Sequence, residues 1–94
     1  MHVRVVRFTD VNAEKLSGTL ARIQDEGGPP AGVSATRLII LQDEAQGTAV
    51  VLQFFDSEED MQASARVLAA MNASETPGKR ASVDACELRL DRTA

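Results

Sequence analysis

Residues 32–61, GVSATRLIILQDEAQGTAVVLQFFDSEEDM, decide the fold of this chain. Two runs of β-branched and other apolar residues, 35–41 and 48–55, flank a short acidic turn that ends in Gly47. This pattern predicts a hairpin of two antiparallel strands, with the glycine free to adopt a positive φ. The segment 56–60, DSEED, predicts the start of a helix, because its serine can cap the first turn and acids are favoured at the positive helix end.

The residues before this stretch predict one strand and one helix. Valines and a phenylalanine interleaved with arginines favour a strand over about 3–8. Thr9 and Asp10 are the candidate N-caps of the helix that follows. Apolar side chains then recur at spacings of 3, 4 and 3, at Ala13, Leu16, Leu20 and Ile23. Gly27-Gly28-Pro29-Pro30 predicts the end of this helix, because proline cannot continue the hydrogen-bond ladder.

The residues after it predict a second helix and a last strand. The helix opens at Ser57 and carries an apolar stripe of Met61, Ala65, Leu68 and Met71. A loop over 72–80 contains Pro77-Gly78, and a strand is expected over about 82–91. Cys86 falls in that strand, where we expect a buried, small apolar side chain.

The predicted order is therefore β-α-β-β-α-β, in a single domain of residues 1–94. Right-handed crossovers place both helices on the same face of the sheet. The expected fold is a ferredoxin-like α+β sandwich, with a four-stranded antiparallel sheet and two helices on one face.

Alternation along the strands divides their residues between two faces of the sheet. We assign the nearly pure apolar set to the helices: Val3, Val5, Leu38, Ile40, Val50, Leu52, Phe54, Cys86, Leu88 and Leu90. The open face then bears the mixed set: Arg4, Val6, Phe8, Arg37, Ile39, Leu41, Ala49, Val51, Gln53, Phe55, Ala85, Glu87 and Arg89. The large apolar side chains of this set would expose a larger apolar patch than a monomer usually tolerates. We therefore expect a homodimer joined through the open sheet faces, which is a dimeric α+β barrel.

Composition argues against several other functions. The net charge is −4 with acids and bases interspersed, so we expect no nucleic-acid partner. No run of 18 apolar residues is present and the N-terminus lacks a signal-peptide pattern, so we expect no membrane association and a cytoplasmic location. One histidine and one cysteine argue against a metal site, and no cofactor motif is present.

The mixed sheet face supplies the candidate site. Apolar walls with a few convergent polar groups are typical of a ligand pocket. The pocket candidates are Arg4, Arg37, Gln53, Phe55 and Glu87, and His2 is the candidate base. The alternative is that these charges pair with each other or with the partner subunit at the ends of the barrel.

Three segments carry a resemblance to a known family: Pro30-Ala31-Gly32-Val33, Thr36-Arg37-Leu38-Ile39-Ile40, and residues 53–60, QFFDSEED. With them the chain resembles the dimeric α+β barrel superfamily, and specifically its antibiotic-biosynthesis-monooxygenase-like branch. The resemblance implies a dimer whose two sheets face each other and enclose a ligand-sized cavity. Members of this superfamily include cofactor-independent oxygenases of aromatic polyketides, haem-degrading enzymes and isomerases.

We therefore expect a small homodimer that binds a small hydrophobic molecule or has an accessory role, without a cofactor. One alternative is a cofactor-independent monooxygenase or isomerase-like enzyme acting on an aromatic substrate, with Arg4 or Arg37 stabilising an enolate-type anion and His2 as the base. A second alternative is an amino-acid-binding regulatory module, since such modules share this element order.

Overall fold

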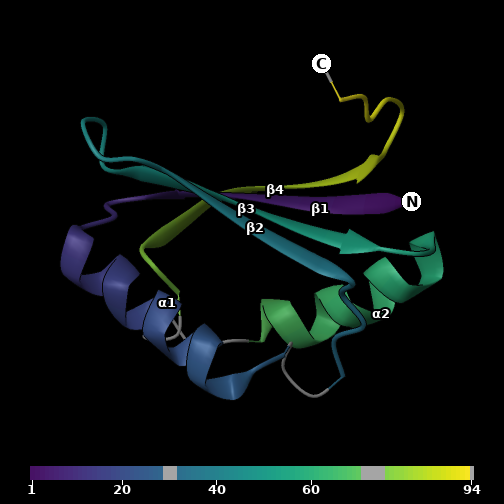
Figure 1. The fold of residues 1–94 in the computed structure, drawn as a ribbon, viewed down its shortest axis with the longest axis horizontal. Helices are drawn as coiled ribbons and strands as arrows, with labels where there is room; N and C mark the ends of the chain where they lie inside the picture. The colour runs from purple at the N-terminus through teal and green to yellow at the C-terminus, as the bar shows by residue number, and fades with distance from the viewer. Residues whose placement is uncertain (29–31, 71–75, 94) are drawn as a thin grey trace.

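The computed structural model describes residues 1–28, 32–70 and 76–93 of the chain and confirms the predicted fold class (Figure 1). Its elements are β1 (His2–Thr9), α1 (Ala13–Glu26), β2 (Arg37–Asp43), β3 (Thr48–Phe55), α2 (Glu58–Ala69) and β4 (Lys79–Glu87). The strands form one antiparallel sheet in the order β2-β3-β1-β4. Both helices cover the same face of this sheet, which leaves the other face open. Pro29, Pro30 and Met71, which entered the predictions, lie outside the described residues.

The start of α1 differs from its predicted cap. The N-cap is Asn12, whose Oδ1 accepts a hydrogen bond of 2.7 Å from the backbone N–H of Lys15. Asp10 instead adopts a positive φ of 53° in the turn that leaves β1, so the chain needs two more residues before the helix can begin. At the other end Gly27 has φ 68° and donates its N–H to the carbonyl of Ile23 at 3.2 Å, as a left-handed C-cap should.

The hairpin and the start of α2 follow the sequence pattern closely. Gly47 closes the turn with φ 65°, and the Oγ of Ser57 accepts from the N–H of Asp60 at 3.1 Å. The buried side of α2 is Met61, Ser64 and Leu68, so the serine takes the place expected for Ala65. Burial does not leave the hydroxyl of Ser64 unpaired, because its Oγ accepts a hydrogen bond of 2.9 Å from the N–H of Ser34.

The last strand lies about three residues earlier than expected. β4 pairs with β1 from Lys79 opposite Thr9 to Glu87 opposite His2, so the ladder ends where β1 begins. Only the N–H of Leu88 continues it, donating to the carbonyl of Met1 at 2.9 Å. The prediction that Cys86 is buried is wrong: it is exposed, because β4 is an edge strand and Cys86 faces away from the helices.

The assignment of faces was wrong for β1, β3 and β4 and correct for β2. The helix-covered face carries Val6 and Phe8 of β1 with Ala49 and Phe55 of β3, all at most 5% exposed. The register pairs Leu38 with Gln53 and Ile40 with Val51, so the two strands of the hairpin are offset by one residue from the predicted grouping. A one-residue offset moves every side chain of a strand to the other face.

The core consists of two clusters on the helix-covered face. One contains Val6, Phe8, Val11, Leu16 and Ala49, under α1. The other contains Val33, Phe55, Met61 and Leu68, under α2. Neither described helix combines the length and apolar composition needed to cross a bilayer.

Gly78, just before β4, allows a close approach of two chain segments. A Cβ at this position would collide with the carbonyl oxygen of Thr9 and lie 2.9 Å from Cγ2 of Val11. We expect Gly78→Ala to lower the free energy of unfolding by about 1–3 kcal/mol, since backbone must move to relieve the clash. Urea unfolding followed by circular dichroism measures the change.

Gly18 provides the matched control, because it lies inside α1 and a Cβ there meets nothing within 4 Å. We expect Gly18→Ala to raise the same free energy by about 0.5–1 kcal/mol through helix propensity. A Gly78→Ala protein as stable as the wild type would contradict this account of the turn.

Candidate functional site: a cavity between the sheet and the helices

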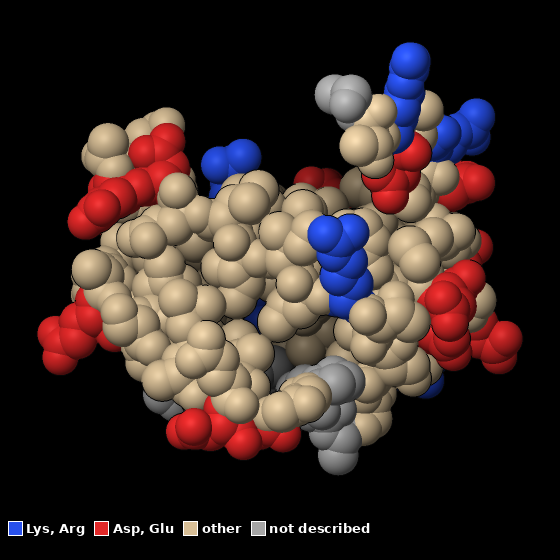
Figure 2. Space-filling view, viewed as in Figure 1, with Lys and Arg blue, Asp and Glu red and all other residues tan. Residues whose placement is uncertain are grey.

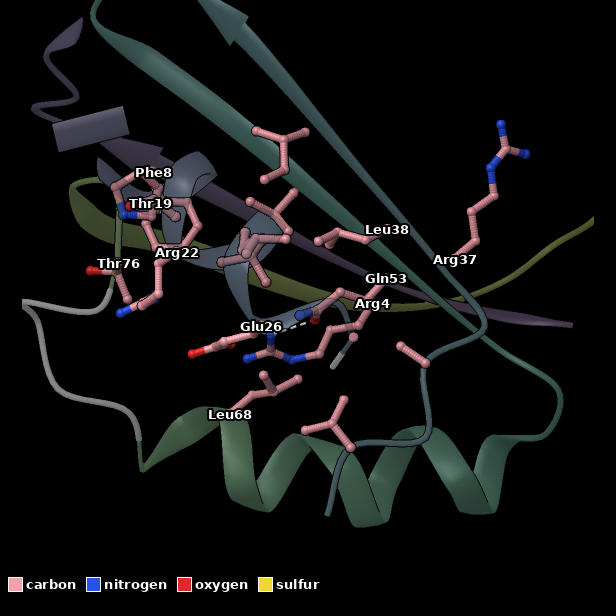
Figure 3. Close-up of a pocket in the computed structure, with 18 of the residues that line it drawn as sticks. Arg4, Phe8, Thr19, Arg22, Glu26, Arg37, Leu38, Gln53, Leu68 and Thr76 are labelled. Carbon is pink, nitrogen blue, oxygen red and sulfur yellow. Dashed lines mark hydrogen bonds between the residues drawn. The ribbon is translucent and has the colours of Figure 1, made fainter. Parts of the chain in front are cut away.

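A cavity of about 490 Å³ lies between the helix-covered face of the sheet and the two helices (Figure 3). Its walls are mostly apolar and include Val6, Phe8, Ile40, Val51 and Leu68. In the space-filling view, acidic side chains gather at the periphery, whereas the centre is mainly uncharged and hollowed (Figure 2). The cavity is of the size and character of a small-molecule site.

Arg4 and Gln53 form the polar part of the sheet wall. They are directly opposite each other on β1 and β3, and Nη1 of Arg4 donates to Oε1 of Gln53 at 3.0 Å. Arg4 is only 5% exposed, and its Nε is buried without a hydrogen-bond partner among the described residues. Burial, and secondarily the charge of Arg80, hold the pKa of the Arg4 guanidinium below its ordinary value.

Arg80 brings a second guanidinium to the same cavity from β4. The register of β1 and β4 shifts between Arg7 and Phe8, so that Phe8 is paired with Arg80. Nη2 of Arg80 donates to the carbonyl of Leu68 at 3.2 Å, and its Nε is also buried without a described partner. This residue was missed from the sequence because position 80 fell in a predicted loop.

Helix α1 supplies the wall opposite the sheet with Thr19, Arg22, Ile23 and Glu26. Glu26 is exposed at the end of the helix, and no described carboxylate makes an ion pair with Arg4. The side chains that could contact a ligand are therefore dominated by apolar groups and by arginines.

The predicted pocket residues divide into two groups. Arg4 and Gln53 meet in the cavity. Arg37 lies at its rim, but its side chain points away, with the guanidinium 5.6 Å from the ring centre of Phe54 (Figure 3).

The remaining predicted residues lie outside the cavity lining. Phe55 is fully buried in the neighbouring core cluster. Glu87 is exposed and lies 3.9 Å from Arg89. His2 is half-buried at the start of β1, opposite Phe55 and Glu87, so the candidate base and Arg4 do not share the cavity.

A cavity between the layers of a single chain differs from the site that the sequence led us to expect, which lay between the sheets of two chains. The cause is the reversed face of β1 and β3: Arg4 and Gln53 point toward the helices. In the part of the chain that the structure describes, no three histidine, cysteine or carboxylate side chains cluster as metal ligands would.

The open face of the sheet is a second candidate for a functional surface. Its residues form three rows across the strands: Arg37, Phe54, Val3 and Cys86; Ile39, Leu52, Val5 and Asp84; and Leu41, Val50, Arg7 and Ser82. We call these residues the open-face patch. Seven of the twelve are large and apolar, and Leu41 is 53% exposed.

No family model matches the chain, and neither curated proteins nor solved structures give a significant match. The fold and the site therefore define the class: a ferredoxin-like α+β domain with an arginine-bearing apolar cavity between its two layers. The resemblance to the dimeric α+β barrel superfamily stays a prediction.

Proposed function

We propose that this protein binds a small, largely apolar molecule in the cavity between its sheet and its helices. The observation that carries the proposal is the cavity itself, about 490 Å³ lined mainly by apolar side chains, with the partly buried Arg4–Gln53 pair on one wall. Apolar walls supply affinity through the area removed from water, and a few fixed polar groups orient the ligand.

Binding fits this arrangement better than the enzymatic alternative. A monooxygenase or isomerase-like reaction would need a proton acceptor beside Arg4, and His2, the candidate base, does not line the cavity. The amino-acid-binding alternative would also need acceptors for an ammonium, and Glu26, the one carboxylate of the described lining, is exposed at the end of α1.

A neutral fluorescent probe tests the proposal. N-phenyl-1-naphthylamine is expected to brighten on binding the wild-type protein, since it enters an apolar environment. Val51→Trp places a large ring into the cavity from β3, so we expect its affinity for the probe to fall at least about tenfold, or about 1.4 kcal/mol. A fluorescence titration measures both dissociation constants.

The matched control is Val50→Trp, the same change at the neighbouring residue, which faces away from the helices. It is expected to leave the probe affinity within about threefold of the wild type. Cooperative unfolding of both variants must first show that they are folded, because a larger side chain can strain a packed core. Probe binding that responds equally to the two substitutions would place the probe elsewhere and defeat the proposal.

We further propose that the protein acts as a homodimer joined through the open-face patch. Both helices cover one face of the sheet and leave the other uncovered (Figure 1). Support for the dimer comes from the rows of apolar side chains that the register places on the uncovered face. At about 25 cal/mol per Å², covering about 400 Å² per subunit contributes on the order of 10 kcal/mol per subunit before the costs of association. Apart from Arg37 at the cavity rim, the patch shares no residue with the cavity lining, so the dimer would leave the ligand site on the far side of each sheet.

A further inference from the structure

The charges inside the cavity narrow the class of ligand. This step rests on the proposed function, because it takes the cavity to be the binding site. Arg4 and Arg80 both line the cavity, and each has an Nε that is buried without a described hydrogen-bond partner. Buried donors are nearly always paired in folded proteins, so two such atoms at one cavity indicate that an acceptor belongs there.

The two guanidiniums also act on each other electrostatically. The charge of Arg80 disfavours the charged form of Arg4, in addition to the effect of burial. Arginine nevertheless stays protonated in proteins, so the folded chain holds two like charges beside an apolar space. One anion placed between them would offset both the desolvation and the repulsion.

Among the residues that the structure describes, no neighbouring group supplies that anion. Arg4 is bonded to the neutral carboxamide of Gln53 at 3.0 Å, and Arg80 to the backbone carbonyl of Leu68 at 3.2 Å. Glu26 lines the helix side of the cavity, but it is exposed and forms no ion pair with Arg4. The lining also contains apolar side chains, including Val6, Phe8 and Val51, and the polar side chains of Thr19 and Thr76.

From this arrangement we infer that the ligand is an apolar carboxylic acid, with its carboxylate held by Arg4 and Arg80 and its hydrocarbon part against the apolar walls. A guanidinium matches a carboxylate with parallel N–H donors, and such charge-assisted hydrogen bonds are about twice as strong as neutral ones. Gln53 acts as a positioning residue, because its Oε1 holds one arm of the Arg4 guanidinium.

Two probes that differ only in charge test the inference. Octanoate and octanamide are nearly the same size, and each is titrated by displacement of bound N-phenyl-1-naphthylamine. We expect octanoate to bind the wild-type protein at least about tenfold more tightly than octanamide. Arg4→Met keeps the apolar stem of the side chain without the guanidinium, and it should remove most of this difference.

Arg66→Met is the control, since Arg66 is exposed in the last turn of α2 and does not line the cavity. It should keep the preference for octanoate. Arg80→Met is the second variant, which decides the matter if Arg4→Met does not fold. Glu26→Gln removes the carboxylate on the helix wall and should tighten octanoate binding, because it removes a like charge from the cavity lining.

The outcomes separate this inference from the proposed function. Equal displacement by octanoate and octanamide, or a preference for octanoate that survives both Arg4→Met and Arg80→Met, would overturn the carboxylic-acid ligand and leave apolar binding standing. If neither octanoate nor octanamide displaces the bound probe, the carboxylic-acid ligand is overturned as well. A wild-type protein that does not bind N-phenyl-1-naphthylamine or either octyl compound would overturn both.

Discussion

If the proposed homodimer forms, Leu52→Glu is expected to convert it into monomers. Leu52 lies on β3 in the middle row of the open-face patch, between Ile39 and Val5. In a two-fold dimer the substitution occurs twice, so two carboxylates would have to be buried without partners. At about 2 kcal/mol or more for each, the dissociation constant should rise on the order of a thousandfold.

Sedimentation velocity at low micromolar concentration measures this change. Leu41→Glu is the second variant, because Leu41 is 53% exposed in the subunit and a charge there cannot disturb its core. Val83→Glu is the matched control: Val83 is 46% exposed on β4, but it pairs with the inward-facing Val6 and so lies on the other face. Loss of the dimer is expected for the first two substitutions and not for the third.

Cys86 gives an independent measure of the same interface. It belongs to the open-face patch and is exposed in the single subunit. Its thiol should therefore react with Ellman's reagent more slowly in the wild type than in Leu52→Glu at the same protein concentration. A wild-type protein that sediments as a single chain, with a thiol as reactive as that of Leu52→Glu, would remove the dimer from the proposal.

Phe55→Ala is expected to lower the free energy of unfolding by about 3–4 kcal/mol, a large share of the stability of a domain of this size. Phe55 is 0% exposed and packs with Val33, Met61 and Leu68, so its loss leaves a cavity that α2 and β3 can only partly close. Guanidinium unfolding followed by circular dichroism gives the value.

The neighbouring Phe54 supplies the opposite expectation. Its ring lies on the open face, half-buried beneath the guanidinium of Arg37. The comparison is made in the Leu52→Glu background, where dimer formation does not contribute to the measured stability. There Phe54→Ala should lower the free energy of unfolding by about 1 kcal/mol or less. A larger loss from Phe54→Ala than from Phe55→Ala would mean that β3 turns its other face to the helices.

These two expectations bear directly on the site. If β3 presents Phe55 to α2, it must also present Gln53 and Val51 to the cavity, because side chains alternate along a strand. The stability of the Phe55 cluster and the location of the Arg4–Gln53 pair are therefore two consequences of the same strand orientation.

Most of the fold was predictable from local patterns in the sequence. The hairpin depends on two apolar runs and a glycine with positive φ, and α2 depends on a serine cap with acids behind it. These signals act over a few residues, so the sequence alone determined the element order, the bounds of β3 and the class of fold. Where local signals competed, as at Thr9, Asp10 and Asn12, the prediction of the helix start was wrong.

The faces of the strands and the position of the candidate site were decided only by the tertiary structure. Both faces of β1 and β3 carry large apolar side chains, so alternation divides the residues into two sets without saying which set meets the helices. That choice depends on contacts between distant segments, such as Phe55 with Val33 and Leu68, and on the β1–β4 register shift beside Arg80. A charged residue such as Arg4 looks like a surface residue in the sequence, and only the packed layers show that it is buried against Gln53.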